Sequence, residues 1–162
     1  MHASHFQILN SMKQQIRQQI KEKIKDIPPQ KKQEYSFRIT QKIIEKFGHL
    51  QTRHIYISMQ DEIDTALLIS HLEKTGKKIF TPDMKEIELQ TIDIIIVPWR
   101  AFTQDGKRLG RGAWRYDRFL AHAKKTSHGR STVVWICFPG QIVKNIPQEP
   151  RDILMDEVIT TE

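Results

Sequence analysis

Two runs of consecutive apolar residues constrain the fold of this chain more than any other feature. They are IDIIIVP (92–98) and STVVWICF (131–138), and the apolar residues in them do not alternate with polar ones. Strands that are buried on both faces have such sequences, and they are typical of parallel sheets covered by helices on both sides. We therefore predict an α/β fold with a central strand at 92–98.

Amphipathic helices are predicted before and between the strands. Apolar residues recur every three or four positions from Leu9 to Ile27, and Pro28-Pro29 ends this helix because proline cannot donate to the helical ladder. A second helix ends at Phe47, with Gly48 as its C-terminal cap. We also predict strands at 54–58, 77–82 and 157–160, a helix from 64–65 that ends at Gly76, a loop at 99–113 and a helix from Trp114 to Lys124.

Length and composition favour one soluble domain. The 162 residues suit a single core, so we predict one domain over residues 1–162, with the N-terminal helices of residues 1–48 packed on it. No apolar run approaches the roughly 20 residues needed to span a bilayer. The lone Cys137 excludes an internal disulfide framework and suits a reducing compartment. We expect a cytoplasmic protein that does not bind membranes.

The net charge of +7 is concentrated in the N-terminal helices. Residues 13–46 contain ten Lys and Arg against four Asp and Glu. This surplus could form a nucleic-acid-binding face, or a solvated helical face that also binds one or two phosphates. Few aromatic residues interleave the lysines and no nucleic-acid-binding motif is present. We favour the second interpretation and do not expect a nucleic-acid partner.

The loop after the central strand is the first candidate for a ligand site. Ligands of parallel sheets gather beyond the carboxyl ends of the strands, and here FTQDGKRLGRGAWRYDRF (102–119) follows such an end. Gly110 and Gly112 would let backbone N–H groups approach phosphate oxygens, and the following helix start adds partial positive charge. Arg108 and Arg111 supply fixed charge, and Asp117 could bind Mg²⁺. A basic surface turn is the alternative.

Three carboxylates form a second candidate site. Asp61, Glu62 and Asp64 lie together just before a predicted helix. N-terminal capping and a ligand role are equally compatible with Asp64, whereas we favour a ligand role for Glu62.

GRGAWRYDR (110–118), behind IIIVPWRAF and GKRLG, resembles the nucleotide loop of the 5-formyltetrahydrofolate cyclo-ligases, also called methenyltetrahydrofolate synthetases. Four other segments agree in order with that family: Lys13 to Arg17, SMQDEIDT (58–65), GKKIFTP (76–82) and the C-terminal stretch from Gln141 to Val158. The resemblance implies a three-layer, Rossmann-like α/β domain with a mostly parallel sheet, of the NagB/RpiA/CoA-transferase type.

The resemblance also implies a set of site residues. ATP would contact Lys13, Arg17, Arg108, Gly110, Arg111, Gly112, Ala113, Trp114, Tyr116 and Asp117, with Lys13 and Arg111 as catalytic residues. The reduced folate would contact Met59, Glu62, Asp64, Trp114 and Tyr116, and Mg²⁺ would be bound by Asp117 and Asp152.

The implied reaction is the ATP- and Mg²⁺-dependent closure of 5-formyltetrahydrofolate to 5,10-methenyltetrahydrofolate, by a monomer or weak dimer. This chain departs from the family pattern at Trp99, Arg100, Trp114 and Arg115, and has only ten residues at 83–92 where the family has a longer stretch that lines the folate pocket. It is therefore identified as a shortened member. The alternative is a non-catalytic nucleotide- or RNA-binding relative that has lost the folate pocket.

Overall fold

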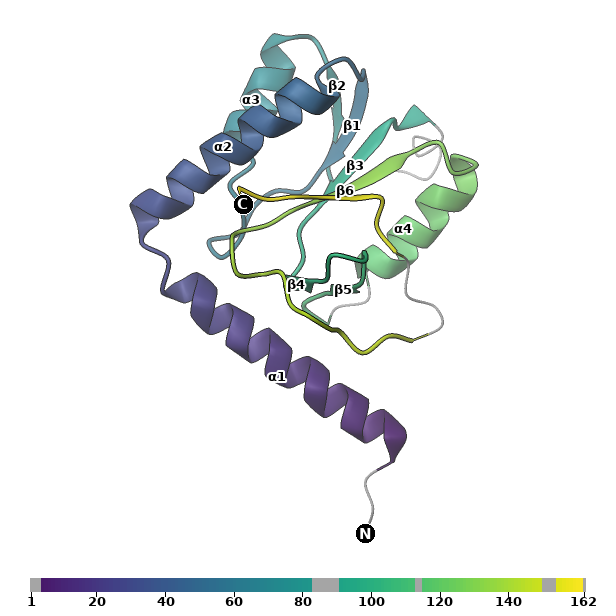
Figure 1. Cartoon of the computed structure of the whole chain (residues 1–162). Helices are drawn as coiled ribbons and strands as arrows, with labels where there is room; N and C mark the ends of the chain where they lie inside the picture. Colours follow the sequence, from purple (N-terminus) through teal and green to yellow (C-terminus); the bar gives the residue numbers. More distant parts are fainter. Residues whose placement is uncertain (1–3, 83–90, 113–114, 150–153, 162) are drawn as a thin grey trace.

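The computed structural model describes residues 4–82, 91–112, 115–149 and 154–161, and it has a parallel sheet at its centre (Figure 1). The strands are β1 (Thr52–Ile55), β2 (Lys78–Phe80), β3 (Ile94–Val97), β6 (Thr132–Ile136) and β7 (Glu157–Ile159). Their order is β2-β1-β3-β6-β7, and every neighbouring pair is parallel. β3 is central and all four of its residues are buried, as its apolar run predicts.

Helices cover both faces of the sheet. They are α1 (His5–Lys25), α2 (Pro29–Phe47), α3 (Ala66–Lys74) and α4 (Arg115–Thr126). Residues of α1, α2 and α3 share one apolar cluster with Ile94 and Ile96, whereas α4 packs its Leu120 against the cluster that contains Ile95. α4 accordingly lies across the sheet from α2 and α3 (Figure 1). The predicted three-layer α/β architecture is confirmed.

One predicted loop contains regular structure. Within 99–113, β4 (Ala101–Phe102) and β5 (Arg108–Leu109) form a short antiparallel pair, which we predicted as loop. Gly106, at φ +86°, lies in the turn between them, as the Asp105-Gly106 signal indicates. Each strand has only two residues, which is too short for a periodic pattern to be recognised. The pairing of β4 with β5 joins the two ends of the segment 101–109, which directly precedes the glycine-rich turn.

The carboxyl ends of β1, β3 and β6 lie side by side at one edge of the sheet. Because β1, β3 and β6 are parallel neighbours, the segments that follow Ile55, Val97 and Ile136 leave the sheet together. In the part of the chain that the structure describes, no helix is long and apolar enough to span a membrane.

Candidate functional site

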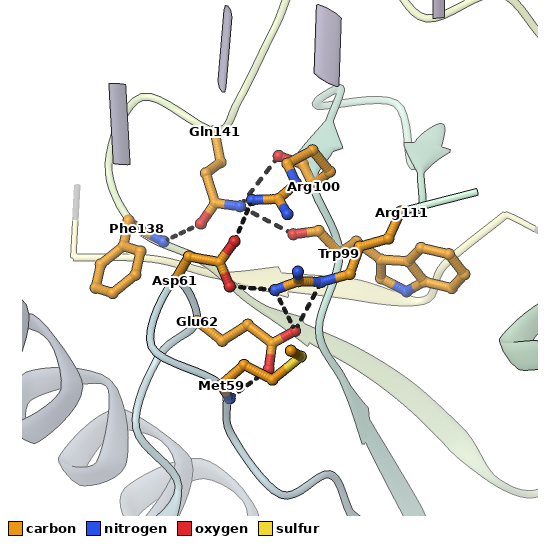
Figure 2. Close-up of polar contacts among 8 residues, drawn as sticks. All are labelled: Met59, Asp61, Glu62, Trp99, Arg100, Arg111, Phe138 and Gln141. Atoms are coloured by element: carbon orange, nitrogen blue, oxygen red, sulfur yellow. Dashed lines mark hydrogen bonds and ion pairs between the residues drawn. The ribbon is translucent and has the colours of Figure 1, made fainter. Parts of the chain in front are cut away.

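Gln141 joins two of the segments that follow the strands. Its Nε2 donates to the carbonyl oxygens of Trp99 and Arg100 at 2.9 and 3.1 Å, and its Oε1 accepts from the backbone N–H of Phe138 at 2.7 Å. Gln141 is itself buried, so these bonds are shielded from competing water. The segment after β3 is thereby held at a fixed position against the segment after β6 (Figure 2).

Arg111 is bound by two carboxylates from the segment after β1. It forms ion pairs with Asp61 and with Glu62, the latter at 2.9 Å, and Asp61 also accepts from Arg100 at 2.8 Å (Figure 2). Burial alone would raise the pKa of Asp61, but the hydrogen bonds from Arg111 and Arg100 hold it below its ordinary value. Asp61 is therefore ionised at neutral pH and links two arginines from different loops.

A cavity of about 290 Å³ opens between α1 and these arginines. Six described residues line it: Gln14, Arg17, Gln18, Lys21, Arg100 and Arg111. Four of the six are cations, so the cavity is suited to an anion with several negative charges. The surplus of positive charge that the sequence showed in the N-terminal helices contributes Arg17 and Lys21 to it.

The two glycines of the loop are required for different reasons, Gly110 for space and Gly112 for its backbone conformation. A methyl group added at Gly110 would lie 2.7 Å from Trp99 Cε3 and closer still to Cζ3, so no larger residue fits against this indole ring. Gly112 has φ +102°, a conformation that L-residues rarely adopt. Arg17 donates from Nε to the Gly110 carbonyl at 2.8 Å, which fixes α1 to the loop. The backbone directly before Arg111 is thus held between Trp99 and Arg17.

Arg108 stabilises the loop from within. Its side chain is 2% exposed, forms an ion pair with Asp117 and stacks 4.6 Å from the centre of the Trp99 ring. Tyr116 contacts the same indole edge-on, with ring centroids 5.8 Å apart. Burial, with a smaller contribution from Glu62, raises the pKa of Tyr116 to about 12, so its hydroxyl remains protonated and can donate.

The predicted folate residues have different surroundings. Met59 is 59% exposed, and its backbone N–H donates to Glu62 Oε2 at 2.8 Å, which orients the Glu62 carboxylate toward Arg111. Asp64 Oδ1 accepts from the Ala66 N–H at 2.9 Å, at the start of α3. This bond stabilises the start of α3, whose N-cap residue is Thr65, and the ligand role predicted for Asp64 stays a prediction.

Lys13 is not among the described residues that line the cavity. It is largely buried and pairs with Glu149 at 3.6 Å, one helical turn before Arg17. Ala113, Trp114 and Asp152 lie outside the described residues, so their predicted contacts remain predictions. The structure therefore brings Arg17, Arg111 and Glu62 together, while Lys13 pairs with Glu149 and Arg108 with Asp117.

The sequence analysis does not identify Arg100 and Gln141 as functional candidates, and it does not single out Asp61 from its neighbours. In the sequence, Asp61 is one of three adjacent carboxylates, Arg100 is a departure from the family pattern, and Gln141 is part of a C-terminal motif. A charged residue three positions after a fully apolar strand is the signal that could have identified Arg100, because such a position is both near the core and at the ligand edge of the sheet.

The match to known families covers almost the whole chain. The sequence profile described as the 5-formyltetrahydrofolate cyclo-ligase family matches two stretches, residues 9–90 and 83–161. This chain belongs to that family. It is a family of ligases, so the predicted enzyme class is confirmed. The two stretches overlap at 83–90, within the segment 83–92 for which we predicted a shortening.

Curated relatives agree with the profile. The 5-formyltetrahydrofolate cyclo-ligase of Mus musculus is 26% identical over 191 residues, which cover 93% of this chain and 94% of the mouse protein. Because 93% of 162 residues is far fewer than 191, the mouse protein has about 40 residues without a counterpart here. The cyclo-ligase of Mycolicibacterium smegmatis is 41% identical over 68 residues, or 42% of this chain and 33% of the relative.

Solved structures show the same fold. The 5,10-methenyltetrahydrofolate synthetase of Mycoplasma pneumoniae superposes with a TM-score of 0.80 at 21% identity, covering 93% of this chain and 99% of that one. The Aquifex aeolicus synthetase gives a TM-score of 0.76 at 20% identity, with coverage of 91% and 88%. These relatives and neighbours are named as cyclo-ligases or synthetases, so the non-catalytic alternative is not favoured.

Proposed function

We propose that this protein closes 5-formyltetrahydrofolate to 5,10-methenyltetrahydrofolate at the expense of ATP, releasing ADP and phosphate. The observation that supports this best is the cation-lined cavity in which Arg17 and Arg111 converge from α1 and the glycine-rich loop. A triphosphate is the anion that such a cavity suits, since it carries several charges along a short chain.

The two substrates would approach from different sides of Arg111. Arg17 and Arg111, with the loop N–H groups around Gly112, would bind the phosphates, and Lys13 would extend this positive face along α1. Met59, Glu62, Asp64 and Tyr116 would face the reduced folate. Tyr116 would donate a hydrogen bond, since burial keeps its hydroxyl protonated. Trp114 is proposed for both ligands from the sequence resemblance alone.

The chemistry requires positioning rather than a strong base. An amide oxygen is a poor leaving group, so the formyl oxygen on N5 attacks the γ-phosphorus of ATP, and ADP departs. N10 then attacks the activated formyl carbon and loses its proton, and the oxygen leaves as phosphate. Arg17 and Arg111 would hold the phosphates in line with the formyl oxygen and neutralise the charge that develops.

Mg²⁺ would enter with the nucleotide. In such sites Mg²⁺ is held by one or two carboxylates together with phosphates and water, and it neutralises phosphate charge. Asp117 fits this role because its carboxylate is 40% exposed at the first turn of α4. The described residues contain no group of three or more His, Cys, Asp or Glu side chains that could form a metal site by itself. Asp152 is proposed as the second carboxylate from the sequence resemblance.

One assay tests the proposal. The purified protein is incubated with ATP, Mg²⁺ and 5-formyltetrahydrofolate, and the absorbance of the methenyl product is followed. We expect product formation by the wild-type chain in the cytoplasmic pH range, and its loss in Arg111→Ala. Arg130→Ala is the matched control, because Arg130 is an exposed arginine that precedes β6 at the opposite edge of the sheet. A folded wild-type protein that forms no product would contradict the proposal.

A further inference from the structure

Arg100 is a buried cation that the proposed function does not use. It is only 8% exposed, two residues beyond the apolar strand β3 and its proline, yet it lines the same cavity as Arg17 and Arg111. A buried charge is costly unless it is paired or binds a ligand. The buried charge of Arg100 must therefore be balanced by a partner, a ligand or both.

Asp61 provides part of the balancing charge for Arg100. Its two oxygens are divided between two arginines: Oδ2 accepts from Arg100 Nη1 at 2.8 Å, and Oδ1 accepts from Arg111 Nη2 (Figure 2). The backbone of Arg100 is also fixed, because its carbonyl accepts from the buried Gln141. One carboxylate thus holds two guanidinium groups from separate loops at a set spacing.

The positive charge of the cavity exceeds what Asp61 and Glu62 can balance. Arg100 and Arg111 share these two carboxylates, but Arg17 donates a hydrogen bond to the backbone carbonyl of Gly110, and Lys21 is an exposed cation that also lines the cavity. The pKa of Arg17 is lowered, first by burial and then by the charge of Arg100. Arg17 and Arg100 are therefore close enough to repel each other, and an anion between them would relieve that repulsion.

We propose that Arg100 is a third phosphate-binding arginine of this cavity, beside Arg17 and Arg111, and that Asp61 is a positioning residue which sets the spacing of Arg100 and Arg111. The inference rests on the proposed nucleotide site and adds two residues to it. The polyphosphate is bound by three guanidinium groups from α1, the segment after β3 and the glycine-rich loop.

Two kinds of probe show whether the cavity binds phosphates or the carboxylates of the folate substrate. Sodium tripolyphosphate and ATP test the phosphate site, and a short γ-linked oligoglutamate tests whether the cavity binds the carboxylates of a folate tail instead. Dissociation constants are measured by calorimetry on the full chain, and circular dichroism verifies that each variant is folded. Arg100→Leu removes the cation while keeping an apolar stem, and Arg130→Leu makes the same change at the opposite edge of the sheet.

We expect Arg100→Leu to weaken the binding of tripolyphosphate and of ATP about tenfold or more, as loss of a charge-assisted hydrogen bond does. Arg130→Leu should bind both probes with the affinity of the wild type. If Arg100→Leu does not fold, Arg100→Lys is measured, and we expect weakening there too because lysine lacks the planar fork. Unchanged phosphate affinity in the folded variant, or a loss confined to the oligoglutamate, overturns the role of Arg100. A wild-type chain that binds neither phosphate probe overturns the nucleotide site as well.

Asp61→Asn provides the test of positioning. The substitution removes a negative charge, so if only net charge mattered, tripolyphosphate would bind more tightly. We expect the opposite, a several-fold loss of affinity, because Arg100 and Arg111 are no longer held together. In the cyclisation assay, the same variant should raise the KM for ATP more than it lowers kcat. Tighter tripolyphosphate binding by Asp61→Asn overturns the positioning role.

Discussion

The indole ring of Trp99 packs directly on the backbone of Gly110, and the carbonyl of the same glycine accepts a hydrogen bond from Arg17. Gly110 is not among the residues with positive φ, so this glycine is needed for space and not for its backbone conformation. The contact fixes the start of the glycine-rich turn between the segment after β3 and helix α1, and thereby the position of Arg111.

The first prediction concerns that contact. Gly110→Ala should destabilise the protein by about 1–3 kcal/mol, the usual cost of overpacking, because the new methyl group collides with the Trp99 ring. In a Trp99→Leu background the same substitution should cost much less. Urea denaturation of the two single variants and the double variant measures the coupling. Equal costs in both backgrounds would show that the indole is not the reason for glycine at this position.

A second prediction tests Arg111 as a phosphate ligand. Arg111→Ala should weaken ATP binding by about 1.5–3 kcal/mol, the range for a hydrogen bond to a charged group. It should also lower stability, since Asp61 and Glu62 lose a shared cation. Calorimetric titration with ATP, with Arg130→Ala as the control, measures the first effect. Nucleotide affinity equal to that of the wild type would remove Arg111 from the site.

Asp117 should show two separable effects. If this carboxylate is a metal ligand, Asp117→Asn should abolish the increase in ATP affinity that Mg²⁺ produces. The structure adds a second expectation: because Asp117 pairs with the buried Arg108, the free energy of unfolding without ATP should fall by about 1–2 kcal/mol. ATP titrations with and without Mg²⁺, beside a urea denaturation curve, report the two effects independently. Normal Mg²⁺ dependence in the variant would leave Asp117 with a structural role alone.

His54 should make stability depend on pH. Burial lowers its pKa from 6.5 to about 4, and in the described structure neither ring nitrogen has a hydrogen-bond partner. Between these values the unfolded chain binds a proton that the folded chain excludes. Stability is therefore complete above pH 6.5 and falls as the pH drops toward 4, by an amount on the order of 3 kcal/mol.

The measurement for His54 is urea denaturation at pH 7.5 and at pH 4.5. His54→Leu keeps an apolar side chain against Phe119 and should remove most of the difference between the two pH values. His49→Gln, at an exposed position, should retain it. A His54→Leu protein with the pH dependence of the wild type would assign that dependence to other groups.

The elements with extended apolar patterns could be predicted from the sequence. β3 and β6 follow from unbroken apolar runs, and α1 ends before the two prolines as expected. The strand predicted at 54–58 is observed at Thr52–Ile55, because Ile57 leaves the sheet and is 61% exposed. The β4–β5 hairpin has two residues per strand, too few to set a period, and it forms because Phe102 and Leu109 are buried by tertiary packing.

The sequence by itself determined the fold class, the family and the glycine-rich segment around Arg111, because burial patterns and motif order are local or linear properties of a chain. Only the tertiary structure decided which charges meet. Asp61 and Arg100 are 39 residues apart, and they pair because β1 and β3 are parallel neighbours whose carboxyl ends share one edge. Lys13 and Arg17 lie one turn apart on α1, yet Lys13 pairs with Glu149 while Arg17 lines the cavity. An ion pair depends on the three-dimensional neighbours of each charge, and no spacing along the chain specifies them.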